Sequence, residues 1–115
     1  MKHTHAPLPD LVDAAGAFAA LGSEQRLQVL RTLVRAGPNG LTIGELGAAT
    51  GITGATLTHH LKILSGADLI QQTKQGRSVI CAAVAYERVR ALSEFLVSEC
   101  CADATTCAHD HGALK

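Results

Sequence analysis

Residues 42–66 read TIGELGAATGITGATLTHHLKILSG. Thr42 is followed three residues later by Glu45, which is the spacing of a capping box. In that motif the hydroxyl and the carboxylate each accept a hydrogen bond from a backbone N–H group that the first turn of a helix leaves free. The pattern predicts a short helix that begins after Thr42, runs to Thr50 and is ended by Gly51.

A second helix is predicted directly afterwards, with Thr53 as its N-cap and Gly66 at its end. Its leucines recur at helical spacing and would line one inner face, which consists of Leu57, Leu61 and Leu64. The two helices are joined only by residues 51–53. A glycine-containing turn of that length is typical of a DNA-binding helix-turn-helix, in which the second helix enters the major groove.

Two further helices are predicted before this unit. The first is capped by Asp10, ends near Gly22 and carries apolar residues at helical spacing: Leu11, Ala14, Ala15, Phe18 and Leu21. The second is capped by Ser23, ends at the turn over residues 37–40 and has an expected buried stripe of Leu27, Leu30, Leu33 and Val34.

After the helical unit, residues 69–74 and 78–83 are predicted to be two strands joined across Gln75 and Gly76. Lys74 and Arg77 flank this turn, which gives the hairpin a basic tip. A last helix is predicted over residues 86–99, with one apolar face formed by Val89, Leu92, Phe95 and Leu96.

The 115-residue chain is in the size range of one domain, and only 3% of it is aromatic, so an aliphatic core of packed helices is expected. No apolar run approaches the roughly 20 residues that a bilayer span needs, and no export signal follows Met1. We therefore expect a cytoplasmic protein with no membrane partner. Its four cysteines are expected to stay reduced and to bind metal or sense redox state rather than form a structural disulfide. No motif indicates catalysis, so an enzyme is not expected.

The formal net charge is zero, but the middle of the chain is basic. Residues 25–80 hold six basic and two acidic side chains, a net charge of +4, as expected if this part faces phosphates. With the leucines pointing inward, the opposite face of the second helix of the helix-turn-helix would meet DNA. The predicted DNA-binding residues are Ala55, Thr58 and His59 at base edges and Lys62, Lys74 and Arg77 at phosphates, together with Thr56.

The stretch from Leu21 to Ala83 resembles the ArsR/SmtB family of dimeric winged-helix repressors. The densest parts of the resemblance are Arg26 with Leu27 and Leu30, the segment LTHHLKIL at 57–64, GADLI at 66–70 and the hairpin tip QGR at 75–77. One departure is that Gly54 and Ala55 stand where many relatives carry polar residues, which predicts fewer base contacts there. The resemblance implies a repressor that binds double-stranded operator DNA.

The resemblance also implies a homodimer formed by the first and last helices. The sequence supports this independently, because both helices carry apolar residues beyond a single stripe. These residues are Val12, Ala15 and Ala19 on the first helix, and Leu92, Phe95 and Leu96 on the last.

Three cysteines lie close together near the C-terminus, at Cys100, Cys101 and Cys107. The intervening segment can loop back, so three thiolates can converge on one ion. Soft thiolates select thiophilic ions, and trivalent arsenic or antimony takes three sulfurs in a pyramid. The pattern predicts an inducer site for As(III) or Sb(III). Cys81 stands apart in the second strand and is expected to be a small buried hydrophobe.

Family resemblance adds to this interpretation. The better-known arsenic site of the family places cysteines at the start of the third helix, and residues 41–46 have none. The familiar zinc site on the last helix needs His and Asp, which residues 86–98 do not offer. The C-terminal Cys-Cys-x5-Cys resembles a subgroup of arsenic-responsive members, which implies a role in arsenical resistance.

Four alternatives stay open. Zinc or cadmium would take four ligands, and His109 or His111 could complete such a site. Relatives that respond to methylarsenite have a cysteine pair at the last helix, for which Cys100 and Cys101 suffice. The cysteines could instead sense thiol oxidation. In a different class, the chain would be a thiol-based metalloid carrier or buffer whose winged helix serves only for protein contact.

The predicted fold class is therefore mostly α with a β wing: a winged helix-turn-helix of about five helices and a two-stranded hairpin. The expected organisation is an N-terminal tail over residues 1–9, a DNA-binding and dimerisation domain over 10–99, and a cysteine-containing sensor tail over 100–115.

Overall fold

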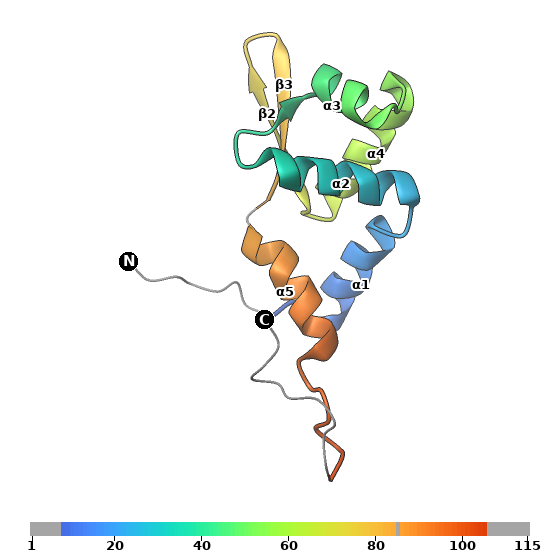
Figure 1. Ribbon diagram of the computed structural model, residues 1–115, viewed down its shortest axis with the longest axis vertical. Coiled ribbons are helices and arrows are strands. Elements are labelled where there is room, and N and C mark those ends of the chain that lie inside the picture. Colours follow the sequence, from blue (N-terminus) through green and yellow to red (C-terminus); the bar gives the residue numbers. More distant parts are fainter. Residues whose placement is uncertain (1–7, 85, 106–115) are drawn as a thin grey trace, which may run out of the picture.

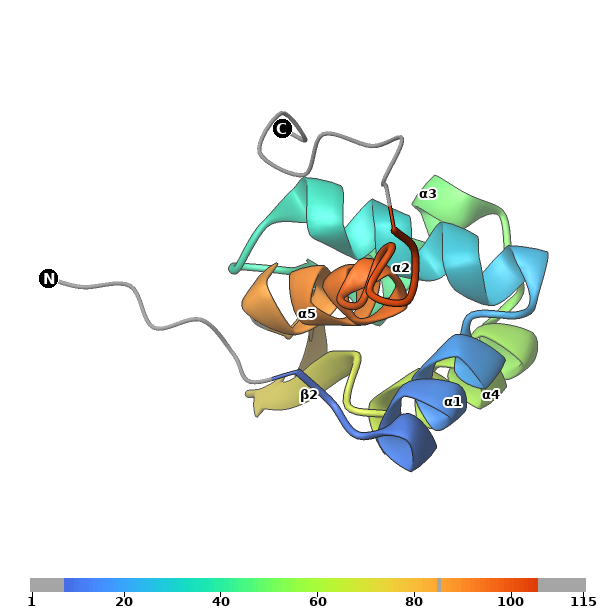
Figure 2. The ribbon, with the colours of Figure 1, turned by 90° about the horizontal axis from the view of Figure 1, so that it is seen from below.

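The computed structural model describes residues 8–84 and 86–105 (Figure 1). Its elements follow in chain order as α1 (Leu11–Ala20), α2 (Glu24–Ala36), β1 (Leu41–Thr42), α3 (Ile43–Thr50), α4 (Gly54–Gly66), β2 (Ile70–Gln75), β3 (Ser78–Ala83) and α5 (Tyr86–Val97). The elements from α2 to β3 form one end of the molecule, and α1 and α5 lie beside each other at the other end (Figures 1 and 2). This arrangement confirms the predicted winged helix-turn-helix.

Most helix starts are fixed by the predicted capping residues. The Asp10 carboxylate accepts from the Asp13 N–H at 2.8 Å, and the Ser23 hydroxyl accepts from a backbone N–H of α2 at 3.3 Å. Thr42 and Glu45 form the predicted capping box, with reciprocal bonds of 3.0 and 2.9 Å. Thr53 stands at the N-cap of α4, but its side chain makes no capping hydrogen bond, so the prediction that it caps this helix is wrong in that respect.

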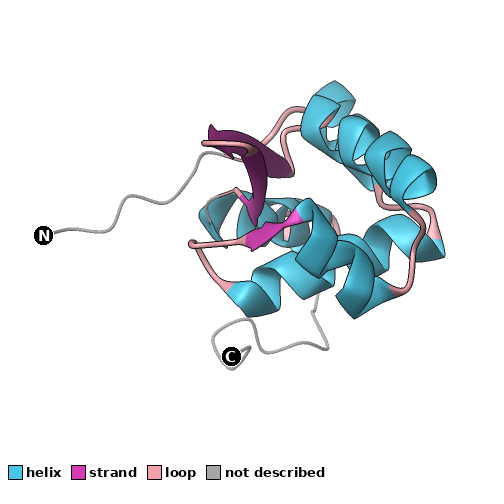
Figure 3. Cartoon of the chain, turned by 90° about the horizontal axis from the view of Figure 1, so that it is seen from above, coloured by secondary structure: helices cyan, strands magenta, loops and turns pink. Residues whose placement is uncertain are grey.

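The sheet has three antiparallel strands in the order β1-β3-β2 and lies at one side of the helices (Figure 3). The hairpin was predicted, but β1 was not, because a strand of two residues, one of them the helix cap Thr42, carries no periodicity. Leu41 pairs with Cys81 in this strand. Gly40 makes the approach possible: its φ is +69°, and a Cβ there would overlap the Cys81 carbonyl.

The hairpin turn is displaced by one residue from its predicted place. Gln75 pairs with Ser78, so the loop consists of Gly76 and Arg77 rather than Gln75 and Gly76. Gly76 has a φ of +61°, which suits the first position of a two-residue hairpin turn. Arg77 therefore stands at the tip itself.

The core is aliphatic, as predicted, and is centred on α2, α3, α4 and the sheet. Its largest fully buried side chains are Val29, Leu33, Leu46, Leu57, Leu61, Leu64, Leu69 and Cys81. The predicted stripe of α2 is partly wrong, because Leu27 and Val34 are 44% and 46% exposed and Val29 is buried instead. Packing against α3, α4 and β3 selects the row that contains Val29, and periodicity alone does not distinguish the two rows.

The inner face of α1 also differs from the prediction. Ala14, Ala17 and Ala20 are buried, whereas Leu11 and Ala15 are exposed. Small side chains thus form the inner row, and several larger ones face outward. The last helix ends at Val97, two residues before its predicted end.

Candidate DNA-binding surface and cysteine site

The predicted reading face of α4 is exposed in the structure. Leu57, Leu61 and Leu64 point into the core, and this fixes the rotation of the helix. The opposite face therefore exposes all five predicted residues of the helix: Ala55, Thr56, Thr58, His59 and Lys62. Gly51 ends α3 in the left-handed conformation, with φ +74°, and the buried Ile52 anchors the turn before α4 begins. The side chains that could meet base edges are thus presented on the exposed face of a helix whose opposite face is packed into the core.

One polar side chain of α4 points inward, and sequence reasoning missed it. His60 is 7% exposed, and its Nε2 lies 2.8 Å from Oε1 of Gln25. Its Nδ1 lies 3.5 Å from a guanidinium nitrogen of Arg26, whose Nε donates to the Ala20 carbonyl at 2.6 Å. These contacts tie α4 to the start of α2. A signal was present, because residue 60 falls within the buried row of leucines.

The surroundings of His60 favour its neutral form. Burial lowers the pKa of this imidazole, and the positive charge of Arg26 and the neighbouring His59 lower it further. A neutral ring that donates from Nε2 to Gln25 leaves Nδ1 free to accept from Arg26. The residue is therefore a structural connector rather than a DNA contact.

The wing carries two exposed cations. Lys74 lies on β2 and Arg77 at the hairpin tip, and both are exposed, as is Lys62 on α4. Over residues 8–84 and 86–105, the single ion pair joins Arg88 to Asp13, so none of these three cations is neutralised by a carboxylate there. Free cations on α4 and on the wing suit contacts to phosphate groups.

The structure brings two of the three predicted metal-ligating cysteines together. Cys100 and Cys101 follow α5 in a turn, with their sulfurs 3.6 Å apart. Cys107, His109 and His111 lie outside the described residues. In the described ranges alone, no group of three His, Cys, Asp or Glu side chains is arranged to hold a metal ion.

The oxidation state of the cysteines differs from the expectation of free thiols throughout. Cys81 and Cys100 are free, whereas Cys101 is disulfide-bonded. Cys81 is fully buried, as predicted; burial raises the pKa of its thiol, while the side chain of Gln72, 4.0 Å away, opposes this.

No helix in the described part of the chain is long and apolar enough to cross a membrane. Residues 21–73 match a family described as a helix-turn-helix domain. Together with the observed wing, this match defines the chain as a winged helix-turn-helix protein, the class that the sequence predicted. Proteins of this class bind DNA through the second helix of the helix-turn-helix.

Solved structures extend this likeness to ArsR-family regulators. One, an ArsR family transcriptional regulator, shares 26% identity and covers 87% of this chain and 99% of its own, with a TM-score of 0.69. HlyU from Vibrio cholerae N16961 shares 28% identity over 78% of this chain and 94% of its own, with a TM-score of 0.62. No curated protein matches the chain.

A homodimeric winged helix-turn-helix DNA-binding domain from Mycobacterium bovis, a possible ArsR-family regulator, has the same fold. It shares 22% identity and covers 87% of this chain and 90% of its own, with a TM-score of 0.62. The chain is thus similar to regulators of the ArsR type, and their fold occurs in a homodimer.

Proposed function

We propose that the chain is an ArsR-type repressor that binds operator DNA as a homodimer and releases it when Cys100, Cys101 and Cys107 bind As(III) or Sb(III). The observation that carries the metalloid response is the 3.6 Å separation of the Cys100 and Cys101 sulfurs. Two metal–thiolate bonds of about 2.3 Å to one ion hold their sulfurs less than about 5 Å apart, so the separation of this pair is within the range of a shared ion once the disulfide of Cys101 is reduced.

The DNA-binding half of the proposal is supported by the exposed face of α4 and by the cations of the wing. Thr58 and His59 offer hydrogen-bonding groups for base edges, while Lys74 and Arg77 carry charge for the backbone. The helix-turn-helix match and the ArsR-family likeness favour the same function.

A thiolate, rather than a disulfide, is the ligand for a soft ion. The metalloid response therefore belongs to the reduced protein. The disulfide of Cys101, next to the free thiol of Cys100, favours a second candidate function, in which oxidation of the cysteine tail is itself the signal. An oxidant without metalloid would then release DNA.

The test uses the full-length protein in reductant and an operator selected from random DNA. Fluorescence anisotropy follows release by arsenite, antimonite, methylarsenite, zinc, cadmium and, without reductant, an oxidant. We expect arsenite and antimonite to release the wild type. Serine variants of Cys100, Cys101 and Cys107 should bind the operator and fail to release it, because a hydroxyl is a poor soft ligand.

Cys81→Ala is the matched control, because this buried cysteine lies outside the proposed site and its variant should respond as the wild type. Arsenite-driven release from a Cys100→Ser/Cys101→Ser double variant would refute the proposed sensor. A Cys107→Ser variant that keeps its full response only to methylarsenite would identify a two-thiolate site. Absence of sequence-specific DNA binding by the reduced protein would favour the carrier class instead.

A further inference from the structure

One arginine near the start of α5 contacts two other helices. The guanidinium of Arg88 donates to both carboxylate oxygens of Asp13 on α1, at 2.9 and 3.3 Å. The same group donates to the carbonyl of Ala67 at 3.0 Å and, more weakly, to that of Asp68 at 3.4 Å. Ala67 and Asp68 follow α4 directly. Arg88 thus joins α5 both to α1 and to the end of the DNA-reading helix.

The residues that Arg88 holds form the joint between the two DNA-binding elements. Ala67 is the C-cap of α4, and β2 of the wing begins at Ile70. Asp68 has a φ of +60°, a left-handed conformation that side chains other than glycine adopt at a cost. Arg88 therefore stabilises carbonyls at the negative end of the α4 dipole and in a strained residue. A shift of this joint would move both α4 and the wing.

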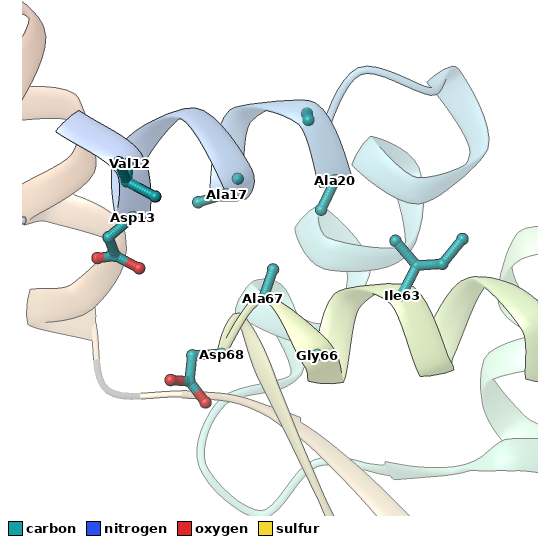
Figure 4. A pocket seen from close by; sticks show the side chains of 10 residues that line it. Val12, Asp13, Ala17, Ala20, Ile63, Gly66, Ala67 and Asp68 are labelled. Atoms are coloured by element: carbon teal, nitrogen blue, oxygen red, sulfur yellow. The ribbon is translucent and has the colours of Figure 1, made fainter.

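The packing between α1 and α4 leaves room for such a shift. A cleft of about 510 Å³ lies between these helices and is lined largely by alanines and glycines, with Asp13 and Asp68 at one end (Figure 4). A Cβ added to Gly16 or Gly66 would meet nothing within 4 Å. The apolar contact between α1 and α4 is therefore incomplete near the place where Arg88 contacts both.

We propose that Arg88 is the positioning residue through which α5 sets the orientation of α4 and the wing. The inference rests on the proposed function for the source of the signal, which arises at the cysteines that follow α5. Displacement of α5 on metalloid binding moves the guanidinium, and the bonds to Ala67 and Asp68 transmit this movement to the joint. Asp13 holds the guanidinium in the required direction from α1.

The test compares Arg88→Lys with a matched control, Arg90→Lys. Lysine keeps the positive charge, but its ammonium group cannot bond at once to the Asp13 carboxylate and to the carbonyls of Ala67 and Asp68, as the planar guanidinium group does. Arg90 lies on the same helix, and its guanidinium stands over the Tyr86 ring, 5.7 Å from the centroid. Sedimentation velocity first checks that all variants have the same oligomeric state. Operator affinity with and without arsenite, arsenite affinity, and amide hydrogen exchange are then measured.

Without inducer, Arg88→Lys should accelerate exchange of the Leu69 amide, which bonds to the Leu64 carbonyl across the joint, and should weaken operator binding. Adding Asp13→Asn should change little more, because both substitutions remove one shared contact. Arg90→Lys should behave as the wild type. Wild-type exchange and wild-type operator affinity in Arg88→Lys would overturn the inference, whatever the inducer.

With arsenite, the wild type should lose operator affinity by roughly 5- to 150-fold, the usual range of allosteric coupling. Arg88→Lys should bind arsenite with unchanged affinity, but arsenite should reduce its operator affinity much less than it does in the wild type. A merely structural role of Arg88 would leave this arsenite-induced reduction unchanged. A reduction as large as in the wild type would contradict the inference. A wild type that arsenite does not release would refute the proposed function alone, because the measurements without inducer decide the role of Arg88.

Discussion

At the scale of single residues, His60 shows how a reading helix is attached to its support. Its ring contacts Gln25 and Arg26 of α2, while the adjacent His59 faces solvent. Two neighbouring histidines on one helix thus have opposite roles, because successive residues are about 100° apart around the axis. The buried ring is held neutral, and this makes the stability of the fold dependent on pH.

We predict that the free energy of unfolding decreases as the pH falls below about 6.5, the usual pKa of histidine. Because the pKa of His60 is lowered in the folded state, the unfolded chain takes up this proton first. Urea unfolding at several pH values measures the effect. His60→Gln, which keeps a donor toward Gln25, should flatten the pH dependence, and His59→Gln, which removes only the smallest contribution to the lowered pKa, should flatten it less. An identical dependence in wild type and His60→Gln would contradict this assignment.

The orientation of α4 could be predicted from the sequence, because three leucines at helical spacing leave one rotation of the helix. His60 was missed because the side chains that pair with its buried ring, Gln25 and Arg26, are distant from it in the sequence. The error at Leu27 and Val34 has another cause. The second helix has two adjacent apolar rows, and contacts made by residues distant in sequence decide which row is buried.

At the scale of elements, α4 and the wing should make different contributions to DNA binding. The exposed side chains of α4 suit base edges, and the hairpin tip carries only charge and a glycine. Base contacts determine specificity, whereas phosphate contacts determine the salt dependence of the affinity.

We predict that Thr58→Ala and His59→Ala each weaken specific binding by about 1 to 3 kcal/mol, while binding to unrelated DNA stays unchanged. Lys74→Ala and Arg77→Ala should weaken binding to all sequences and reduce the slope of log K against log salt by about 1 for each lost contact. Anisotropy titrations over a range of salt concentrations separate the two effects. Wild-type specificity in both α4 variants would show that the reading face is assigned wrongly.

The missed strand β1 illustrates a limit of sequence patterns at this scale. Leu41 and Thr42 form a strand only because β3 lies beside them, and Gly40 permits the approach. Two residues give no alternation to detect. The hairpin was predictable because both of its strands and its turn glycine are close together in the chain.

At the scale of the whole molecule, α1 and α5 present apolar side chains to solvent in the single chain. Val12 is 81% exposed and Leu96 68%, and both belong to the sets predicted for the dimer interface. Of those sets, Leu92 is buried within the chain, and Phe95 packs against the core. The exposed remainder supports a second copy of the chain as the partner of this end.

We predict that Leu96→Glu makes the protein monomeric at concentrations where the wild type is dimeric, because a charge in an apolar interface is costly to desolvate. Because a monomer contacts only one half of a palindromic operator, the affinity for such an operator should fall when the dimer is lost. Leu27→Glu, at an exposed leucine of α2, is the matched control and should leave the dimer intact. Sedimentation velocity measures the oligomeric state of each variant. A dimeric Leu96→Glu variant would show that the interface lies elsewhere.

The cysteine pair lies after the last residue of α5, and neither Cys100 nor Cys101 belongs to the buried core. Substitutions at these positions therefore leave the packing of the buried core unchanged, and a Cys101 substitution costs only the contribution of its disulfide. If the cysteines bind an inducer as proposed, their ligand set can change while the DNA-binding end stays unchanged. Exchange of the segment after α5 alone should then give a biosensor for a different soft ion.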